Sequence, residues 1–356
     1  MIDFRYHVVS LISVFLALAV GIALGAGPLK ETIGDTLTGQ VELLRSEKEE
    51  LRTQLDATGG DLAAAEAFTS AAGERMLAGS LTDRRVALVL LGDVPEDEVA
   101  ALTERFEQSG ASVSATASVT TAWTDPALAT YRRTLAGTLV SYLTTPPAAD
   151  AGTETELAEA LVSALVGADS AAPDLLSENA SALLDVLAEG DRALVSFAQD
   201  VTRPADAVVL VVGTTPDDGA SPSPAATPVS YDAQLALADA AQRLSQGAVV
   251  AGPARGSESL VTAVRGDDRL ADRITTVADA TTVTGQVVVP LALAAAIGER
   301  PGHYGYGDDL TVLPPLVELE PVDRTPVVPG SQETTPDDAG GEGAGQEIGQ
   351  DAGGEG

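Results

Sequence analysis

An uninterrupted apolar segment near the N-terminus constrains this chain more than any other feature. Residues 8–26 contain no charged side chain and only two serines, Ser10 and Ser13. At about 1.5 Å per residue, a helix of this length nearly spans a hydrocarbon core of about 30 Å. A helix buried in a soluble protein would normally carry a polar face, which this segment lacks. The segment therefore predicts a single transmembrane helix, which ends at Gly27 and Pro28.

A cleaved signal peptide is the alternative interpretation of the same segment. The apolar run of a signal peptide is usually about 7–15 residues long and is followed by small residues at the cleavage site. The run here is longer, although residues 23–25 resemble a weak cleavage site. We favour a membrane anchor over residues 1–29. A seven-residue head followed by a large domain predicts an N-inside orientation with the body extracytoplasmic, although Arg5 and Lys30 flank the helix on both sides.

Residues 30–80 carry the heptad pattern of a coiled-coil stalk. Apolar residues recur at alternating steps of four and three, with charged residues between them. The predicted seam for an oligomer or a partner helix contains Leu37, Val41, Leu44, Lys48, Leu51, Leu55 and Leu62, with Thr58 also at a seam position. The alternative is an amphipathic helix that packs on its own domain. We expect Gly59 and Gly60 to interrupt or end the stalk, and a further helix to cover residues 61–77.

The pattern changes after Arg84, where short apolar runs alternate with helical segments. The runs that predict strands cover residues 86–91, 111–119, 193–197, 207–212, 248–251 and 274–277. The segments that predict helices cover residues 95–109, 127–142, 154–166, 173–187, 231–245, 257–264 and 284–297, of which 287–290 is ambiguous. This alternation predicts an extracytoplasmic α/β domain over residues 81–317, with a mostly parallel sheet and helices on both faces.

Three of the predicted strands end in glycine followed by polar residues or proline. Ligands of open α/β sheets bind at the carboxyl ends of the strands. We therefore take Asp93, Thr214 and Ser257 as markers of candidate ligand loops. The alternative is that each glycine only makes the tight turn from strand to helix, and none of the loops matches a phosphate-binding pattern.

Composition excludes several classes of function. The formal charge is −33, so the chain repels DNA and RNA, and we expect no nucleic-acid partner. There is no cysteine, which excludes disulfides and thiolate sites. Residues 214–228 form a flexible insertion by composition. Residues 318–356 contain ten acidic residues and one arginine, and predict a disordered acidic tail that is either simply solvated or attracts cations or a basic partner.

The sequence contains no known catalytic or metal-binding motif. The chain has no GxxxxGK[ST], GxSxG or HExxH sequence, and its only histidines are His7 and His303. Soft copper ligands are Cys, Met and His, and the two methionines are Met1 and Met76. A high-affinity copper site within one chain is therefore not expected, which leaves a weak copper contact. We assign no catalytic residue, no metal ligand and no cofactor, and an enzyme is disfavoured.

Four sequence blocks resemble a known family. They are MIDFRYHVVS at residues 1–10, FLALAVGI at 15–22, LGAGPL at 24–29 and GHYG at 302–305. They closely resemble the mycobacterial copper transport protein B (MctB) family of actinobacteria. The resemblance covers residues 1–315 in layout. It implies an envelope protein associated with copper efflux or tolerance, described as an outer-membrane channel. Related members also resemble components of cell-separation machinery, in which the coiled coil would engage a peptidoglycan hydrolase system.

Two functions from different classes follow. The resemblance implies copper transport by an oligomeric envelope protein, in the outer membrane or another membrane. The heptads favour a single-pass scaffold whose stalk binds its own copies or a helical partner. An outer-membrane barrel would need repeated strands of about 10 residues that alternate apolar and polar side chains, and these are not evident. An uncharged helix such as residues 8–26 would not line a pore by itself.

Overall fold

The structure is a computed structural model that describes residues 4–25, 29–213, 230–253, 259–307 and 309–327, with the backbone alone for residues 29–38. The chain divides into two compact units, residues 1–76 and 77–356. The candidate loop residues Thr214 and Ser257, and residues 328–356 of the predicted tail, lie outside the described residues.

Helix α1 (Phe4–Gly25) confirms the predicted apolar helix and begins four residues before the predicted start of the apolar run. Among the described residues it is the one helix that is long and apolar enough to cross a membrane. None of its side chains is buried within the chain. An apolar helix of this length with none of its side chains buried has the properties that insertion into lipid requires.

Helix α2 (Leu29–Leu77) is continuous over 49 residues, which corresponds to about 74 Å at 1.5 Å per residue. The expected interruption at Gly59 and Gly60 is wrong, because the helix runs through both. Each glycine costs about 1 kcal/mol of helix stability relative to alanine. The alanine-rich residues 61–72 that follow have high helix propensity and can offset this cost.

The second unit contains a seven-stranded sheet in the order β3-β2-β1-β4-β5-β6-β7. Every pairing is parallel except that of β2 with β3, so the predicted mostly parallel α/β fold is confirmed. The strands are β1 (Arg85–Leu91), β2 (Ser112–Val119), β3 (Val195–Phe197), β4 (Ala207–Val212), β5 (Ala248–Gly252), β6 (Thr275–Ala278) and β7 (His303–Tyr304). The sequence pattern does not predict the two-residue strand β7, since it is too short to form an apolar run.

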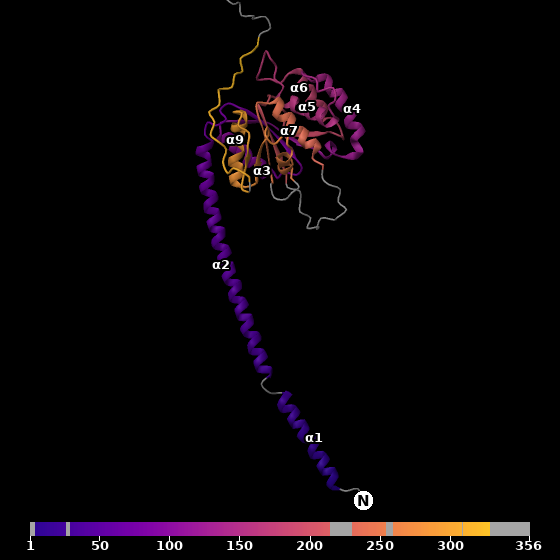
Figure 1. The fold of residues 1–356 in the computed structure, drawn as a ribbon, viewed down its shortest axis with the longest axis vertical. Coiled ribbons are helices and arrows are strands. Elements are labelled where there is room, and N and C mark those ends of the chain that lie inside the picture. The colour runs from indigo at the N-terminus through magenta and orange to yellow at the C-terminus, as the bar shows by residue number, and fades with distance from the viewer. Residues whose placement is uncertain (1–3, 26–28, 214–229, 254–258, 308, 328–356) are drawn as a thin grey trace, which may run out of the picture. The chain divides into compact units, whose positions relative to one another are not determined.

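Helices cover both faces of the sheet. They are α3 (Glu96–Gln108), α4 (Ala129–Leu139), α5 (Thr153–Val166), α6 (Glu178–Ala188), α7 (Asp232–Leu244), α8 (Leu260–Gly266) and α9 (Val283–Ile297), with the 3-10 turns η1 (Thr121–Trp123), η2 (Pro126–Leu128) and η3 (Val140–Tyr142). Helices α4 to α8 pack on one face, and α3 and α9 pack on the other (Figure 1).

The central strand β1 explains why two layers of helices are needed. Val86, Leu88 and Leu90 point into the core beneath α3 and α9, whereas Ala87 and Val89 point into the core beneath α4 to α8. Side chains alternate across a strand, so a continuously apolar strand presents an apolar surface on both faces. Both surfaces must be covered, which is why the apolar run of β1 belongs at the centre of a sheet.

Helix α9 resolves the ambiguous segment 287–290 as helical, with Pro290 inside the helix. Thr282 caps its N-terminus by accepting a hydrogen bond from the Gly285 N–H at 3.1 Å. The helix is apolar on all sides, and its residues from Gly285 to Ala296 are buried. Its β-branched residues are therefore explained by complete burial rather than by a strand.

An extended segment, residues 313–327, lies along the second unit after the last strand. Its Leu319 packs against the core beneath α3 and α9, and the Val327 N–H donates to the Ser170 carbonyl oxygen at 2.8 Å. The predicted acidic tail begins at Glu318, so its first ten residues, 318–327, include these contacts. The acidic composition of this segment predicts disorder, but the segment also contains isolated apolar residues. These residues are too few to form a core of their own, yet they are sufficient to attach the extended segment to the existing core.

Candidate functional site

The predicted ligand edge of the sheet lies where β1 and β4 are neighbours. The chain leaves β1 toward β2 on one side and leaves β4 toward β5 on the other, so this is the position where the strand order reverses. Asp93 follows β1 there, and Gly213 follows β4. A Cβ atom on Gly213 would lie 2.1 Å from the Asp93 carbonyl oxygen, and the Gly213 N–H donates to the Leu91 carbonyl oxygen at 2.9 Å. The two backbones touch, so close packing explains this glycine without a ligand.

A pocket of about 750 Å³ lies on the side of the sheet that α4 to α8 cover. Its walls are η1, the Arg132 side chain of α4, the N-terminal end of α5, the first two turns of α7 and the segment that follows α8. Its polar lining consists of Thr124, Arg132, Glu154, Thr155, Ser230, Asp232, Asp239, Asp267, Arg269 and Arg273. Nothing in the local sequence pattern points to this pocket, because its residues come from separate segments. The one available signal is the concentration of charge at residues 265–273.

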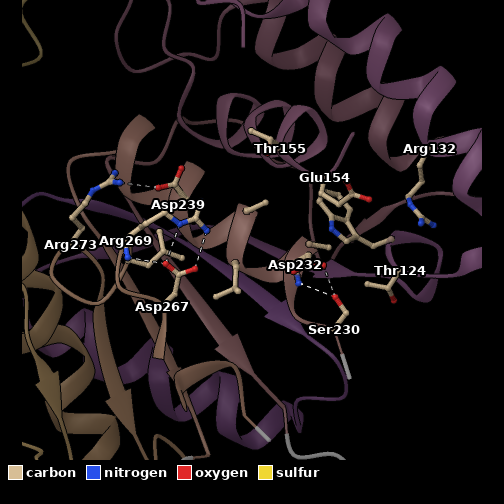
Figure 2. Close-up of a pocket in the computed structure, with 15 residues that line it drawn as sticks. Thr124, Arg132, Glu154, Thr155, Ser230, Asp232, Asp239, Asp267, Arg269 and Arg273 are labelled. Atoms are coloured by element: carbon tan, nitrogen blue, oxygen red, sulfur yellow. Dashed lines mark hydrogen bonds and ion pairs between the residues drawn. The ribbon is translucent and has the colours of Figure 1, made fainter. Parts of the chain in front are cut away.

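One end of the pocket is electrostatically satisfied. Arg269 Nη2 lies 2.9 Å from Asp267 Oδ2, and Arg273 Nη1 lies 3.3 Å from Asp239 Oδ1. Figure 2 shows these pairs joined by dashed lines at the left of the pocket. The hydrogen bonds from the Arg269 side chain hold the pKa of Asp267 below its usual value. Asp239 is shared with Arg243, whose Nε lies 2.9 Å from Asp239 Oδ2 and which also pairs with Glu159. The charges of this network balance and leave little charge for a ligand.

The other end holds charged groups that form no ion pair within the part of the chain that the structure describes. Arg132 is only 7% exposed, and its Nη1 donates to the carbonyl oxygens of Ala122 at 3.0 Å and Asp125 at 2.6 Å. Glu154 and Asp232 are exposed carboxylates. Figure 2 shows Arg132 and Glu154 at the right of the pocket with no dashed line to either. This end is therefore the part of the pocket with charge available for a ligand.

His303, the chemically most versatile side chain of the body, is used internally. Its Nδ1 lies 2.9 Å from Thr276 Oγ1, and the ring also forms a hydrogen bond with the backbone of Ala271. Burial lowers the pKa of His303, and the positive charge of Arg265 lowers it further. His303 is thus a neutral, partly buried link between β7 and its neighbours, and it is not presented as a metal ligand.

Across the described ranges, no group of three or more His, Cys, Asp or Glu side chains could hold a metal ion. His7 lies on α1, in the other unit, and cannot be assigned to a site with His303.

The seam residues of α2 are exposed in the single chain. The exposed fractions are 44% for Val41, 63% for Leu44, 65% for Leu51, 72% for Leu55 and 58% for Leu62. Lys48 is also exposed, and the side chain of Leu37 lies outside the described part. The coiled coil itself stays a prediction, since a single chain cannot test it.

Comparison with known proteins gives one consistent result. A family model described as "Copper transport outer membrane protein, MctB" matches residues 1–315. The chain is 31% identical to copper transporter MctB of Mycobacterium bovis over 317 residues, which is 86% of this chain and 97% of that protein. The values for the protein of the same name in Mycobacterium tuberculosis are identical. The Mycobacterium leprae protein is 27% identical over 332 residues, 87% of this chain and 98% of that protein.

These similarities run through both units, from the apolar helix α1 to the residues beyond β7. The relatives are named as copper transporters and not as enzymes, and an N-terminal apolar helix fits a membrane protein. With a family model that matches most of its length and a relative above 30% identity over most of both chains, this chain belongs to the MctB family.

Proposed function

We propose that this protein takes part in copper transport at the cell envelope as a membrane-anchored, non-enzymatic component. The observation that carries the proposal is the match to the MctB family over residues 1–315, together with relatives named as copper transporters. In the proposed topology α1 anchors the chain in an N-inside orientation, and the α/β body is extracytoplasmic. An outer-membrane position is the one that the family description favours.

The chemistry of the described residues limits how one chain could act on copper. Helix α1 has no charged or soft ligand side chain between residues 8 and 25, so a single copy offers no lined path for an ion. His303 is bound internally, His7 lies on α1 in the other unit, and Met76 is the one thioether among the described residues. We therefore propose that the protein handles copper only through weak contacts or as part of an assembly, rather than through a tight site within one chain.

The assembly would form through α2. Its exposed seam residues, such as Leu44, Leu51 and Leu55, recur at heptad spacing, and their burial in a coiled coil would remove apolar surface from water. Lys48 at one seam position would cost stability but fix the register. We propose a small parallel homo-oligomer, because the identical seam of a second copy is complementary by symmetry.

The copper role is tested by deleting the gene and measuring cellular copper and growth on copper. We expect the mutant to accumulate more copper and to stop growing at lower copper concentrations, and the full-length gene to restore both. A matched test replaces His303 with Asn, which should rescue as well as the natural gene because His303 is not proposed to bind copper. Unchanged copper content and tolerance in the deletion mutant would overturn the proposal.

A second candidate function is a membrane scaffold whose stalk engages a cell-separation or cell-wall hydrolase partner. The exposed seam on α2 favours it, because that surface suits a partner helix as well as a second copy. Cells that carry Leu44→Glu and Leu51→Glu should then separate abnormally while their copper content stays normal. Normal separation of these cells would exclude the scaffold.

A further inference from the structure

We propose that the pocket between η1, α5 and α7 binds a basic α-amino acid, free or in a short peptide. The ligand would present one carboxylate to Arg132 and Trp123, and ammonium groups to Glu154 and Asp232. Such a ligand is independent of copper transport and belongs to the α/β body alone. The pocket volume of about 750 Å³ lies within the roughly 300–1,000 Å³ typical of small-molecule sites.

The carboxylate side rests on the N–H donors of two largely buried side chains. Arg132 is 7% exposed and Trp123 is 3% exposed, and both line the pocket. The structure gives partners only to Nη1 of Arg132, and within the described residues neither its other N–H groups nor the indole N–H of Trp123 has one. None of these N–H groups is among the fully buried atoms without a partner in the described residues, so they reach solvent, and a carboxylate can accept from a guanidinium and an indole at once.

The position of Arg132 is fixed before any ligand arrives. Its Nη1 donates to two backbone carbonyl oxygens, those of Ala122 and Asp125, which lie on either side of Trp123 in the chain. These bonds hold the guanidinium and the turn that carries the indole in one arrangement. A preorganised donor pair loses little conformational entropy on binding, which is a property of built sites and not of surface arginines.

The ammonium groups of the ligand would bind the carboxylates of the pocket that form no ion pair. Arg269 pairs with Asp267 and Arg273 pairs with Asp239, within the network whose charges balance. The remaining charges are positive at Arg132 and negative at Glu154 and Asp232. A ligand with one carboxylate and two ammonium groups complements this set.

Simple ions fit the pocket less well than such a ligand. Glu154 and Asp232 repel an inorganic anion, and Arg132 repels a free metal cation. Asp232 already accepts a hydrogen bond from the Ser230 hydroxyl at 2.8 Å, which fixes the orientation of its carboxylate.

The test uses the full chain in lipid nanodiscs and the intrinsic fluorescence of Trp123, which is the only tryptophan of the protein. Titration with L-lysine should change the emission saturably at millimolar concentrations or below, about 4 kcal/mol or more of binding free energy at 1 mM. The dipeptide alanyl-lysine distinguishes a peptide ligand from the free amino acid, and saturable binding of either supports the proposal. No saturable change with either, or an equal change with inorganic phosphate, would overturn it.

Two charge-removing variants identify the site. Glu154→Gln and Asp232→Asn should each weaken L-lysine binding about tenfold, since each removes one charged hydrogen-bond partner from an exposed position. The matched control is Glu178→Gln, which alters an exposed first-turn glutamate of α6 that does not line the pocket. It should leave binding unchanged. Equal affinity for the natural protein and both pocket variants would sink the assignment. Arg132 is left intact because it also holds η1.

Discussion

Arg324 Nη2 lies 2.6 Å from Asp206 Oδ2, and this contact joins the end of the described chain to the entrance of the central strand β4. The same carboxylate oxygen accepts from the Arg85 N–H at 2.7 Å, at the start of β1. The Arg324 guanidinium also donates to the Asp83 carbonyl oxygen at 2.8 Å. A residue in the segment predicted as a tail thus helps to fix the two central strands of the sheet.

Replacement of Asp206 with Asn should destabilise the body by about 2–3 kcal/mol, because the variant leaves the positive charges of Arg84, Arg85 and Arg324 without their common partner. Replacement of Arg324 with Ala should cost less, about 1–2 kcal/mol, since it also removes a like charge beside Arg84 and Arg85. Thermal unfolding of the full chain, followed by circular dichroism, measures both.

The control for this pair is Asp174→Asn. Asp174 lies 2.8 Å from Arg85 Nη2, but its side chain is 77% exposed, so we expect a change below about 1 kcal/mol. The prediction fails if Asp174→Asn destabilises the protein as much as Asp206→Asn does.

Local sequence pattern is sufficient for the central part of the fold. The strands β1, β4 and β5 are apolar on both faces, so both faces must be buried. This requirement predicts a parallel sheet with helices on each side. Local sequence pattern is not sufficient where tertiary contacts determine the structure of a segment. Strand β7 is two residues long and lies in a glycine-rich stretch. The extended segment that carries Arg324 has no periodic pattern of apolar residues.

The pocket could not be predicted from the sequence either, because tertiary packing brings its residues together. Arg132, Glu154 and Asp232 look like ordinary surface charges in their own helices, and only the packing of α4 and α7 against α5 brings them to one cavity. The sequence shows that Gly213 follows β4, but it does not show why glycine is needed there. Its neighbour is the backbone of a distant loop, which no local pattern reveals.

Gly213→Ala should destabilise the body by about 3 kcal/mol, because the new Cβ atom would lie 2.1 Å from the Asp93 carbonyl oxygen and the two loops would have to separate. Gly137 is the matched control. It occupies an exposed position of α4 where an added Cβ atom would meet nothing within 4 Å, so Gly137→Ala should stabilise the protein by up to about 1 kcal/mol. Thermal unfolding of both variants should therefore shift in opposite directions, and a shift in the same direction would contradict the close approach.

His303 should make stability depend on pH. Burial and Arg265 lower its folded-state pKa below the unfolded value of about 6.5, so the unfolded chain binds a proton more readily than the folded chain. The neutral ring therefore contributes to the free energy of unfolding at pH values above about 6.5. This contribution is lost as the pH falls below the unfolded-state pKa, until the folded ring is protonated as well.

The comparison variant is His303→Asn, which keeps a polar group near Thr276 but does not titrate. We expect the difference in unfolding free energy between the natural protein and the variant to shrink as the pH falls from about 8 to about 5. Unfolding by denaturant at several pH values measures it. A difference that is constant or grows toward low pH would mean that the ring is not held neutral by its surroundings.

The stalk offers the sharpest test of assembly, because α2 carries leucines on and off the predicted seam. Leu44 and Leu51 occupy seam positions and are 63% and 65% exposed in the single chain, whereas Leu43 lies beside the seam with a similar exposure of 60%. Leu44→Glu with Leu51→Glu would place like charges at the centre of a coiled coil and should dissociate it, while Leu43→Glu should not. Analytical ultracentrifugation of the full chain in detergent gives the oligomeric state of each. Since the control adds a charge to the same helix at similar exposure, loss of the oligomer in all variants would point to general solubility effects, and its retention in all of them would remove the seam from the assembly.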